Sequence, residues 1–125
     1  MTYRQIFPIL STADIHRLVS FYVTAVDAAV TYQFPAEGDP GYVALELAGG
    51  HLGIGLDPAA PGIDTAQRAA LWLYADDCDE AFARLVRAGA GVVEEPADMP
   101  WGERVAKVTD PDGNIVHLGQ APTSA

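Results

Sequence analysis

The side chains best suited to chemistry in this sequence are its histidines, tryptophans and tyrosines. His51 and His117 lie in two apolar segments, HLGIGL and NIVHLG, and a histidine can serve as a hydrogen-bond partner, a general base or a metal ligand. Trp72 and Tyr74 alternate along LWLY, so both rings would project from one face of a strand as flat apolar walls with polar tips. These residue types predict a pocket for a small organic molecule.

Four further candidates for this pocket come from neighbouring segments. Trp101, in MPWGER, precedes a strand at a loop position where periodicity does not force burial. Tyr42 and Glu46 share one face of YVALEL, while the alternating valine and leucines would face the other way. Gly55 would leave floor space for a ligand. Plainer alternatives remain, because aromatic rings also pack sheets, Glu46 could lie at a solvated edge, and His117 could simply donate a hydrogen bond.

Composition and charge restrict the class of protein. The chain has 125 residues, of which 50% are hydrophobic and 19% charged, so residues 1–125 are expected to form one globular domain. Its net charge of −10 disfavours nucleic acid and would attract a cationic ligand, or merely keeps the protein in solution. No apolar stretch approaches the ~20 residues that cross a bilayer, and the N-terminus lacks a basic and apolar leader. We therefore expect a cytoplasmic protein with no membrane or nucleic-acid partner.

The elements expected in the first half of the chain recur in the second half. A helix capped by Ser11 or Thr12 would bury Ile15, Leu18 and Tyr22, and a second helix would begin at Asp76 or Asp77 and end near Gly89. The expected strands lie at 6–10, 31–34, 42–47 and 51–56 in the first half, and at 71–75, 91–95, 104–109 and 114–119 in the second.

This recurrence predicts an internal repeat. A shift of 62 residues places Asp76 on Asp14 and Val105 on Val43, and would keep both hairpins at one length. We expect a first module at about 4–58, a linker at about 57–68, which is rich in proline and glycine, and a second module at about 69–120. The predicted fold class is α+β, with two βαβββ modules that form a curved mixed sheet around a central cup.

Two segments carry a resemblance to a known family. PILSTADIHRLVSFY at 8–22 and WGERVAKVTDPDGNIVHLGQ at 101–120 resemble the glyoxalase, bleomycin-resistance and extradiol-dioxygenase superfamily, also called the vicinal oxygen chelate superfamily. The resemblance covers nearly the whole chain. It implies paired βαβββ modules around a cup that is often completed across a homodimer.

The resemblance also indicates which residues would occupy the metal-ligand positions of the family. Metal-dependent members carry their ligands on the first and last strand of each module, which correspond here to Pro8, Gly55, Ala70 and His117. Three of these four side chains cannot coordinate a metal, whereas a catalytic site typically needs about three protein ligands. The resemblance therefore favours the metal-free branch, whose members sequester bleomycin, mitomycin or enediyne antibiotics. We expect a metal-independent and cofactor-free homodimer that binds an aromatic or cationic small molecule.

Two enzyme hypotheses stay open beside sequestration. The first is a metal-free isomerase or lyase of secondary metabolism, with His117, Glu46 or Tyr74 in acid and base roles. The second is a metal-dependent glyoxalase or dioxygenase that uses His51 and His117. The sequence does not decide whether the protein is an enzyme, although binding without catalysis is the leading hypothesis.

Overall fold

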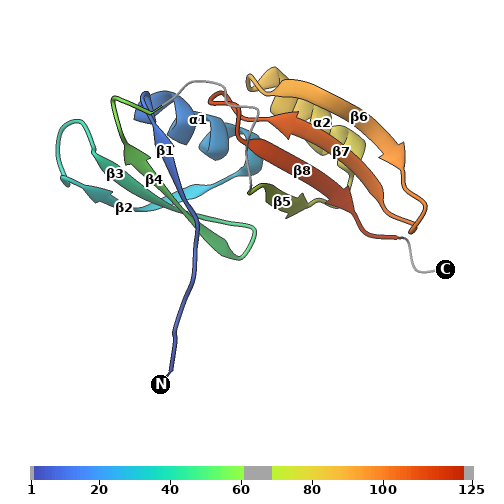
Figure 1. Cartoon of the computed structure of the whole chain (residues 1–125), viewed down its shortest axis with the longest axis horizontal. Coiled ribbons are helices and arrows are strands. Elements are labelled where there is room, and N and C mark those ends of the chain that lie inside the picture. The colour runs from blue at the N-terminus through green and yellow to red at the C-terminus, as the bar shows by residue number, and fades with distance from the viewer. Residues whose placement is uncertain (1, 61–68, 123–125) are drawn as a thin grey trace.

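A computed structural model describes residues 2–60 and 69–122, which form two consecutive βαβββ modules (Figure 1). The predicted α+β class and the paired modules are confirmed, whereas residues 61–68 of the expected linker lie outside the described residues. The first module contains β1 (Ile9–Thr12), α1 (Ile15–Val26), β2 (Ala29–Phe34), β3 (Tyr42–Leu47) and β4 (Gly50–Leu56). The second contains β5 (Leu71–Tyr74), α2 (Cys78–Arg87), β6 (Gly91–Asp98), β7 (Arg104–Thr109) and β8 (Ile115–Gln120).

Each module builds its own four-stranded mixed sheet. The strand order is β1-β4-β3-β2 in the first sheet and β5-β8-β7-β6 in the second. β1 runs parallel to β4 and β5 parallel to β8, while the remaining pairs are antiparallel. The two sheets lie side by side, each with a helix of its own module packed on it (Figure 1). One face of each sheet is therefore covered by a helix, and the opposite face is open.

The helix α1 begins two or three residues later than the sequence indicated. Its N-cap is Asp14, whose carboxylate accepts a hydrogen bond of 3.1 Å from the backbone N–H of Arg17. The expected caps Ser11 and Thr12 belong to β1 instead. Thr12 still contributes, because its Oγ1 accepts a hydrogen bond of 3.0 Å from the N–H of Asp14 and so holds the cap in place.

The helix α2 follows its predicted boundaries. Asp77 caps it by accepting from the N–H of Glu80 at 3.0 Å, so of the two expected caps Asp77 is the correct one. Acidic residues in its first turn and basic residues in its last turn match the helix dipole. Gly89 follows the helix with φ of +113°, a conformation that favours glycine. No helix within residues 2–60 and 69–122 is long and apolar enough to span a membrane.

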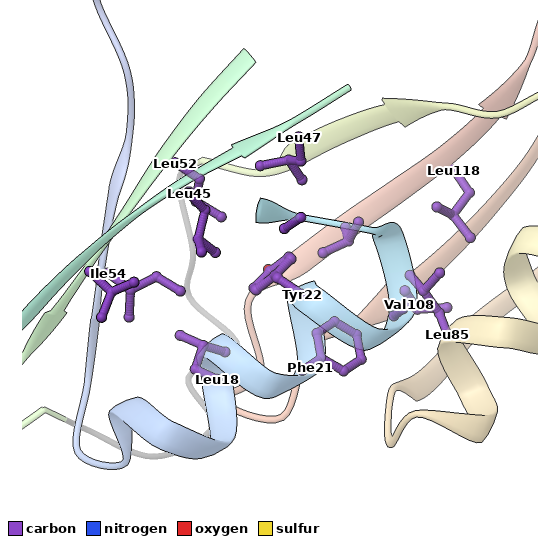
Figure 2. Packing of buried hydrophobic residues seen from close by; sticks show 14 of the residues in the cluster. Leu18, Phe21, Tyr22, Leu45, Leu47, Leu52, Ile54, Leu85, Val108 and Leu118 are labelled. Carbon is purple, nitrogen blue, oxygen red and sulfur yellow. The ribbon is translucent and has the colours of Figure 1, made fainter. Parts of the chain in front are cut away.

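A single hydrophobic cluster lies between the helices and the covered faces of both sheets (Figure 2). Alternate residues of β3 point into it, as expected from YVALEL, and Leu45 is completely buried. α1 contributes Leu18 and Tyr22, and α2 contributes Leu85. Because residues of both modules enter one cluster, neither module completes its core alone. The largest fully buried side chains are Tyr22, Leu18, Leu45, Ile54, Leu85 and Leu118.

The register of the repeat differs from the predicted shift of 62 residues. The helix caps Asp14 and Asp77 lie 63 residues apart, and the last strands correspond at an offset of 64, which pairs Gly53 with His117. The expected equality of the two hairpins is wrong, because residues 48–49 connect β3 to β4 whereas residues 110–114 connect β7 to β8. A shift of one residue in the alignment of a strand exchanges the residues on its two faces. The alignment therefore decides which residues of β7 are expected on the open face.

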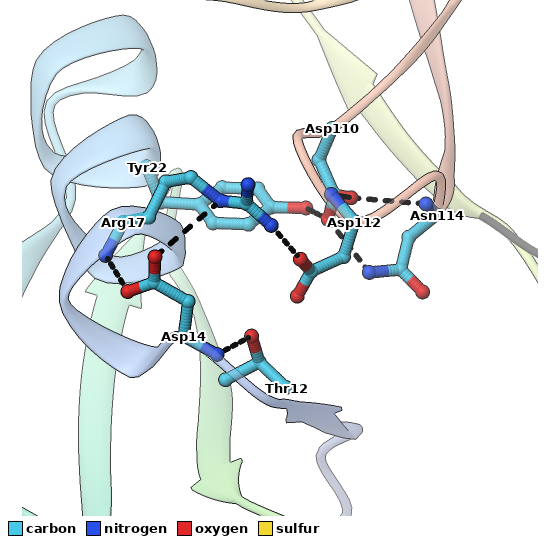
Figure 3. A network of polar contacts seen from close by, with 7 residues as sticks. All are labelled: Thr12, Asp14, Arg17, Tyr22, Asp110, Asp112 and Asn114. Atoms are coloured by element: carbon cyan, nitrogen blue, oxygen red, sulfur yellow. Dashed lines mark hydrogen bonds and ion pairs between the residues drawn. The ribbon is translucent and has the colours of Figure 1, made fainter. Parts of the chain in front are cut away.

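The loop at residues 110–114 joins the two modules through a buried carboxylate (Figure 3). Asp110 is 2% exposed and accepts a hydrogen bond of 2.8 Å from the hydroxyl of Tyr22 on α1. The same carboxylate accepts from the backbone N–H groups of Asp112 and Asn114 and from the Asn114 side chain. Burial and the charge of Asp110 raise the pKa of Tyr22 well above 10, so the phenol stays protonated and continues to donate.

Two ion pairs at the surface reinforce this junction. Arg17 on α1 lies 2.7 Å from Asp112, and Arg84 on α2 lies 2.7 Å from Asp27, which follows α1. Arg84 also donates to the carbonyl of Thr24. Pairs of this kind contribute little when solvent surrounds them. The buried Tyr22–Asp110 contact therefore carries more of the coupling between modules than the exposed pairs.

We predict that Tyr22→Phe destabilises the protein by about 1 to 3 kcal/mol, because Asp110 stays buried and loses its phenolic donor. Tyr32→Phe is the matched control, since the Tyr32 side chain is 54% exposed and its change should stay within about 0.5 kcal/mol. Equilibrium urea unfolding measures both. Equal losses of unfolding free energy in the two variants would contradict the assigned role of Tyr22.

Candidate functional site

Large apolar side chains are concentrated on the open faces of the two sheets. Tyr74 and Trp101 are each 61% exposed, and Trp72 is 42% exposed. On the first sheet Tyr32 and Phe34 are also more than half exposed. Clustered exposed aromatic side chains of this kind mark surfaces that bind a ligand or another chain.

The second sheet carries two rows of side chains across its open face. Strand register places Trp72 of β5 beside His117 of β8, and His117 beside Lys107 of β7. The Trp72 and His117 rings are stacked, with centroids 5.0 Å apart and planes inclined by 20°. The next row contains Tyr74 and Gly119, and the Tyr74 ring centroid lies 5.8 Å from that of Trp72. Together these residues form the aromatic floor.

Gly119 determines how the Trp72 ring lies on this floor. A Cβ atom built on Gly119 would be 2.8 Å from Nε1 of Trp72 and 3.0 Å from its ring carbon Cζ2. Real Cβ atoms do not approach so closely, so any larger residue would displace the indole. The absence of a side chain at this position allows the ring to cover the strand.

Glu103 connects Trp101 to the aromatic floor. Its Oε1 accepts a hydrogen bond of 2.6 Å from the Trp101 indole N–H, which orients a ring that otherwise projects from a loop. The Glu103 carboxylate also acts on the Tyr74 hydroxyl, and this interaction is the main reason that the pKa of Tyr74 is raised. Trp101 and Tyr74 are thus held at the same end of the floor by one carboxylate.

At the other end of the floor, His117 has a lowered pKa. Partial burial is the larger cause and the nearby Lys107 ammonium is the second, while Glu94 acts in the opposite direction. Lys107 and Glu94 are register partners on β7 and β6, with Nζ and Oε1 3.9 Å apart. His117 is therefore a neutral imidazole at pH 7, stacked on Trp72 and flanked by a cation.

The open face of the first sheet holds the remaining predicted residues. Tyr42 lies across Gly53, since a Cβ there would be 2.5 Å from the Tyr42 hydroxyl, and its register partner is Gly55. Glu46 and His51 are register partners at the other end of the hairpin. The predicted parity of β3 is thus confirmed, with Tyr42 and Glu46 on the open face.

The eight predicted site residues divide between the two open faces. Four gather at the aromatic floor: Trp72, Tyr74, Trp101 and His117. Tyr42, Glu46 and Gly55 lie on the first sheet, and His51 borders a hollow of about 180 Å³ that it shares with Trp72 and Pro8. The strands of the two sheets make few contacts with each other, so one chain presents two half-sites.

The residues around His117 do not suit a divalent metal ion. Its register partners are Trp72 and Lys107, neither of which is a metal ligand at neutral pH, and the nearby Glu94 carboxylate lies against Lys107. Pro8 and Ala70 precede their strands, and Gly53 is the residue equivalent to His117, which corrects the earlier placement on Gly55. Within residues 2–60 and 69–122, no group of three or more His, Cys, Asp or Glu side chains is placed to hold a metal ion.

Sequence reasoning missed Lys107 and Glu103. The shift of 62 aligned Val105 with the core residue Val43, and under that shift Lys107 would correspond to the core residue Leu45. The observed register pairs Val105 with Gly119, so Lys107 shares the open face with His117. The alternation of RVAKVT could have indicated this face, because a lysine seldom faces a core. Nothing in the sequence indicated that Glu103 would contact both Trp101 and Tyr74.

The fold and the aromatic open faces together define a paired βαβββ protein. A profile of the Glyoxalase/Bleomycin resistance protein/Dioxygenase superfamily matches residues 5–118. The chain therefore belongs to this superfamily. A Mycobacterium tuberculosis (strain CDC 1551 / Oshkosh) protein named "Putative glyoxylase CFP32" is 30% identical over 97 residues, which cover 78% of this chain and 36% of that protein. The chain thus spans about a third of the length of this relative.

Solved structures show the same fold. TioX from Micromonospora sp. ML1 superposes with a TM-score of 0.75 at 24% identity, covering 94% of this chain and 98% of TioX. A bleomycin resistance determinant encoded on the transposon Tn5 superposes with a TM-score of 0.69 at 22% identity, covering 97% of this chain and 100% of that protein. At these identities the likeness establishes the fold.

We predict that His117 titrates below the ordinary histidine value of 6.5. Its unfolded state then binds a proton at higher pH than its folded state, so the contribution to stability falls as the pH drops below about 6.5. Lys107→Met should raise the pKa of His117, and Glu94→Gln should lower it. NMR titration of the histidine ring protons measures these values, with His117→Gln for assignment. A wild-type pKa above 6.5 that Lys107→Met leaves unchanged would contradict this electrostatic description.

Proposed function

We propose that this protein binds a planar aromatic natural product, of the antibiotic class, and sequesters it unchanged without a metal or cofactor. The observation that carries the proposal is the aromatic floor, where Trp72 is stacked on the neutral His117 and Tyr74 lies beside Trp72, with the exposed Trp101 in the loop before β7. Aromatic pairs contribute about 0.5 to 1.5 kcal/mol each beyond the area they bury. Several such surfaces in one site favour a flat polycyclic ligand.

The residues of the floor favour binding over catalysis. A general base usually needs a partner that orients it, and within the described residues His117 stacks on an indole ring and has Lys107, which offers no acceptor, as a register partner. The Glu103 carboxylate is occupied by Trp101 and Tyr74. The structural likeness to a bleomycin resistance determinant is consistent with a binding role.

A metal-free isomerase or lyase is the second candidate. It is favoured by one observation, the lowered pKa of His117, which leaves the imidazole free to accept a proton at neutral pH. Sequestration and catalysis differ in the fate of the ligand, so chromatography of the compound after long incubation separates them. One zinc ion retained per chain after desalting, and lost in His117→Ala, would instead favour a metal enzyme.

The proposed binding form is a homodimer. Each chain exposes two apolar open faces whose strands make few contacts with each other, and each face carries part of the predicted site. A two-fold axis that sets the first sheet of one copy against the second sheet of the other would cover both faces at once and create two equal cups. In such a dimer Tyr42 and Gly55 of one copy would face Trp72 and His117 of the other.

We predict that an antibiotic of the bleomycin, mitomycin or enediyne type quenches tryptophan fluorescence, because Trp72 and Trp101 are the only tryptophans in the sequence. At 100 times its dissociation constant, the ligand should add about 2.7 kcal/mol to the stability, measured as a rise in Tm. Trp101→Ala should weaken binding by roughly 1 to 3 kcal/mol, whereas Val86→Ala, on the exposed side of α2, should not. No quenching by any compound of the panel would count against the proposal.

We predict a dimer in sedimentation equilibrium, with cups that are shared between copies. Gly55→Trp should block one half-site, because the nearest atom to a Cβ there is 3.9 Å away and the chain can accept the ring. Trp72→Ala should disable the other half-site. Each variant alone should lose binding, and mixed dimers should regain one site per dimer, since one cup then has two intact faces. A cup within one chain would show no recovery on mixing, and a persistent monomer would contradict the dimer itself.

A further inference from the structure

Lys107 is the one lysine in a sequence with a net charge of −10, and it lies on the open face of the second sheet. It is the register partner of His117, which in turn is the register partner of Trp72. The other cation on the described strands of this sheet is Arg104, which faces α2 and pairs with Asp79 at 2.7 Å. Lys107 is therefore the positive group at the aromatic floor.

The Lys107 ammonium has little to bind within the chain. Within residues 2–60 and 69–122 its ion pair is with Glu94 at 3.9 Å, which is longer than a hydrogen bond. The arginine pairs of Arg17 and Arg84 are much tighter, at 2.7 Å. The Lys107 side chain is only 29% exposed, so its stem packs on the sheet while its three N–H donors stay available.

The acidic group at the other end of the floor is already engaged. Glu103 accepts a hydrogen bond from the Trp101 indole at 2.6 Å, so a ligand cation would compete with this donor. The charge of the whole chain attracts cations at long range, but salt screens that field beyond about 10 Å. A direct contact with an ammonium on a partly dry surface is screened less.

We propose that the ligand of this site is a planar aromatic acid, whose carboxylate or phenolate binds Lys107 while its rings lie against Trp72 and His117. Neighbouring strands are about 4.8 Å apart, so a molecule of two or three rings spans the row from Trp72 to Lys107. The inference rests on the proposed function and narrows it, because it replaces the cation expected from the net charge with an acid. It assigns Lys107 as the residue that selects the ligand.

Three naphthalene probes of equal shape and different charge test this assignment. They are 2-naphthoate, the neutral 2-naphthalenemethanol and the cationic 2-naphthylmethylammonium, each titrated at neutral pH with quenching of tryptophan fluorescence as the readout. The wild-type protein should prefer 2-naphthoate over the alcohol by roughly tenfold to a hundredfold, the range expected for a hydrogen bond to a charged group.

The matched variants remove one positive charge at different places. Lys107→Met keeps most of the side-chain volume and should abolish the preference for 2-naphthoate while leaving binding of the alcohol within twofold of wild type. Lys107→Arg should retain the preference. Arg87→Met removes a charge from the exposed side of α2 and should change none of the three affinities. Circular dichroism and Tm confirm that each variant is folded.

The outcomes separate the inference from the function on which it rests. If the alcohol and 2-naphthoate bind equally well, or if the preference survives in Lys107→Met, the assignment of Lys107 is wrong and the aromatic floor stands. If the ammonium probe binds best, the net charge governs selection and the inference is also wrong. If none of the probes binds the wild-type protein, the proposed aromatic binding site fails together with the inference.

Discussion

The buried hydrogen bond between Tyr22 and Asp110 holds the two halves of this protein in one arrangement. The tyrosine belongs to the first helix and the aspartate to the last hairpin, so the contact joins segments 88 residues apart in sequence. Asp110 also organises its own loop by accepting from Asp112 and Asn114. A carboxylate without these donors would be costly to bury, so the loop, the helix and the module junction depend on one another.

This junction holds both helices on the same side of the two sheets. α1 and α2 share one hydrophobic cluster with the inner faces of the two sheets, and no helix of the described residues covers the outer faces. Aromatic side chains that would be core residues in another arrangement are thus left exposed, as Tyr74 and Trp101 show. The same packing that completes the core creates the surfaces that we propose as half-sites.

Electrostatics act at two ranges in this protein. Seventeen acidic residues against seven basic ones give a field that attracts cations toward the molecule as a whole. At the aromatic floor the local charge is positive, because Lys107 is adjacent to His117, and after partial burial it is the second cause of the lowered pKa of His117. The negative charge of Glu103 does not offset Lys107 there, since this carboxylate interacts with Trp101 and Tyr74 at the other end of the floor. Local contacts, and not the net charge, therefore define what this floor can bind.

The sequence by itself determined the elements and the repeat. Periodicity identified the buried faces of α1 and β3, an aspartate and a glycine delimited α2, and alternation put Trp72 and Tyr74 on one strand face. These features are local, so the spacing of residues along the chain is enough to specify them. The resemblance to the superfamily was also evident from the sequence, in residues 8–22 and 101–120.

Only the tertiary structure decided which strand residues become neighbours. The two hairpins have connections of different length, and a register that slips by one residue exchanges the faces of a strand. That slip concealed Lys107, whose place beside His117 depends on the pairing of β7 with β8. The contact of Glu103 with Trp101 and Tyr74, and the division of the predicted residues between two sheets, depend likewise on distances across the fold. Spacing along a chain does not fix those distances, because packing between distant segments sets them.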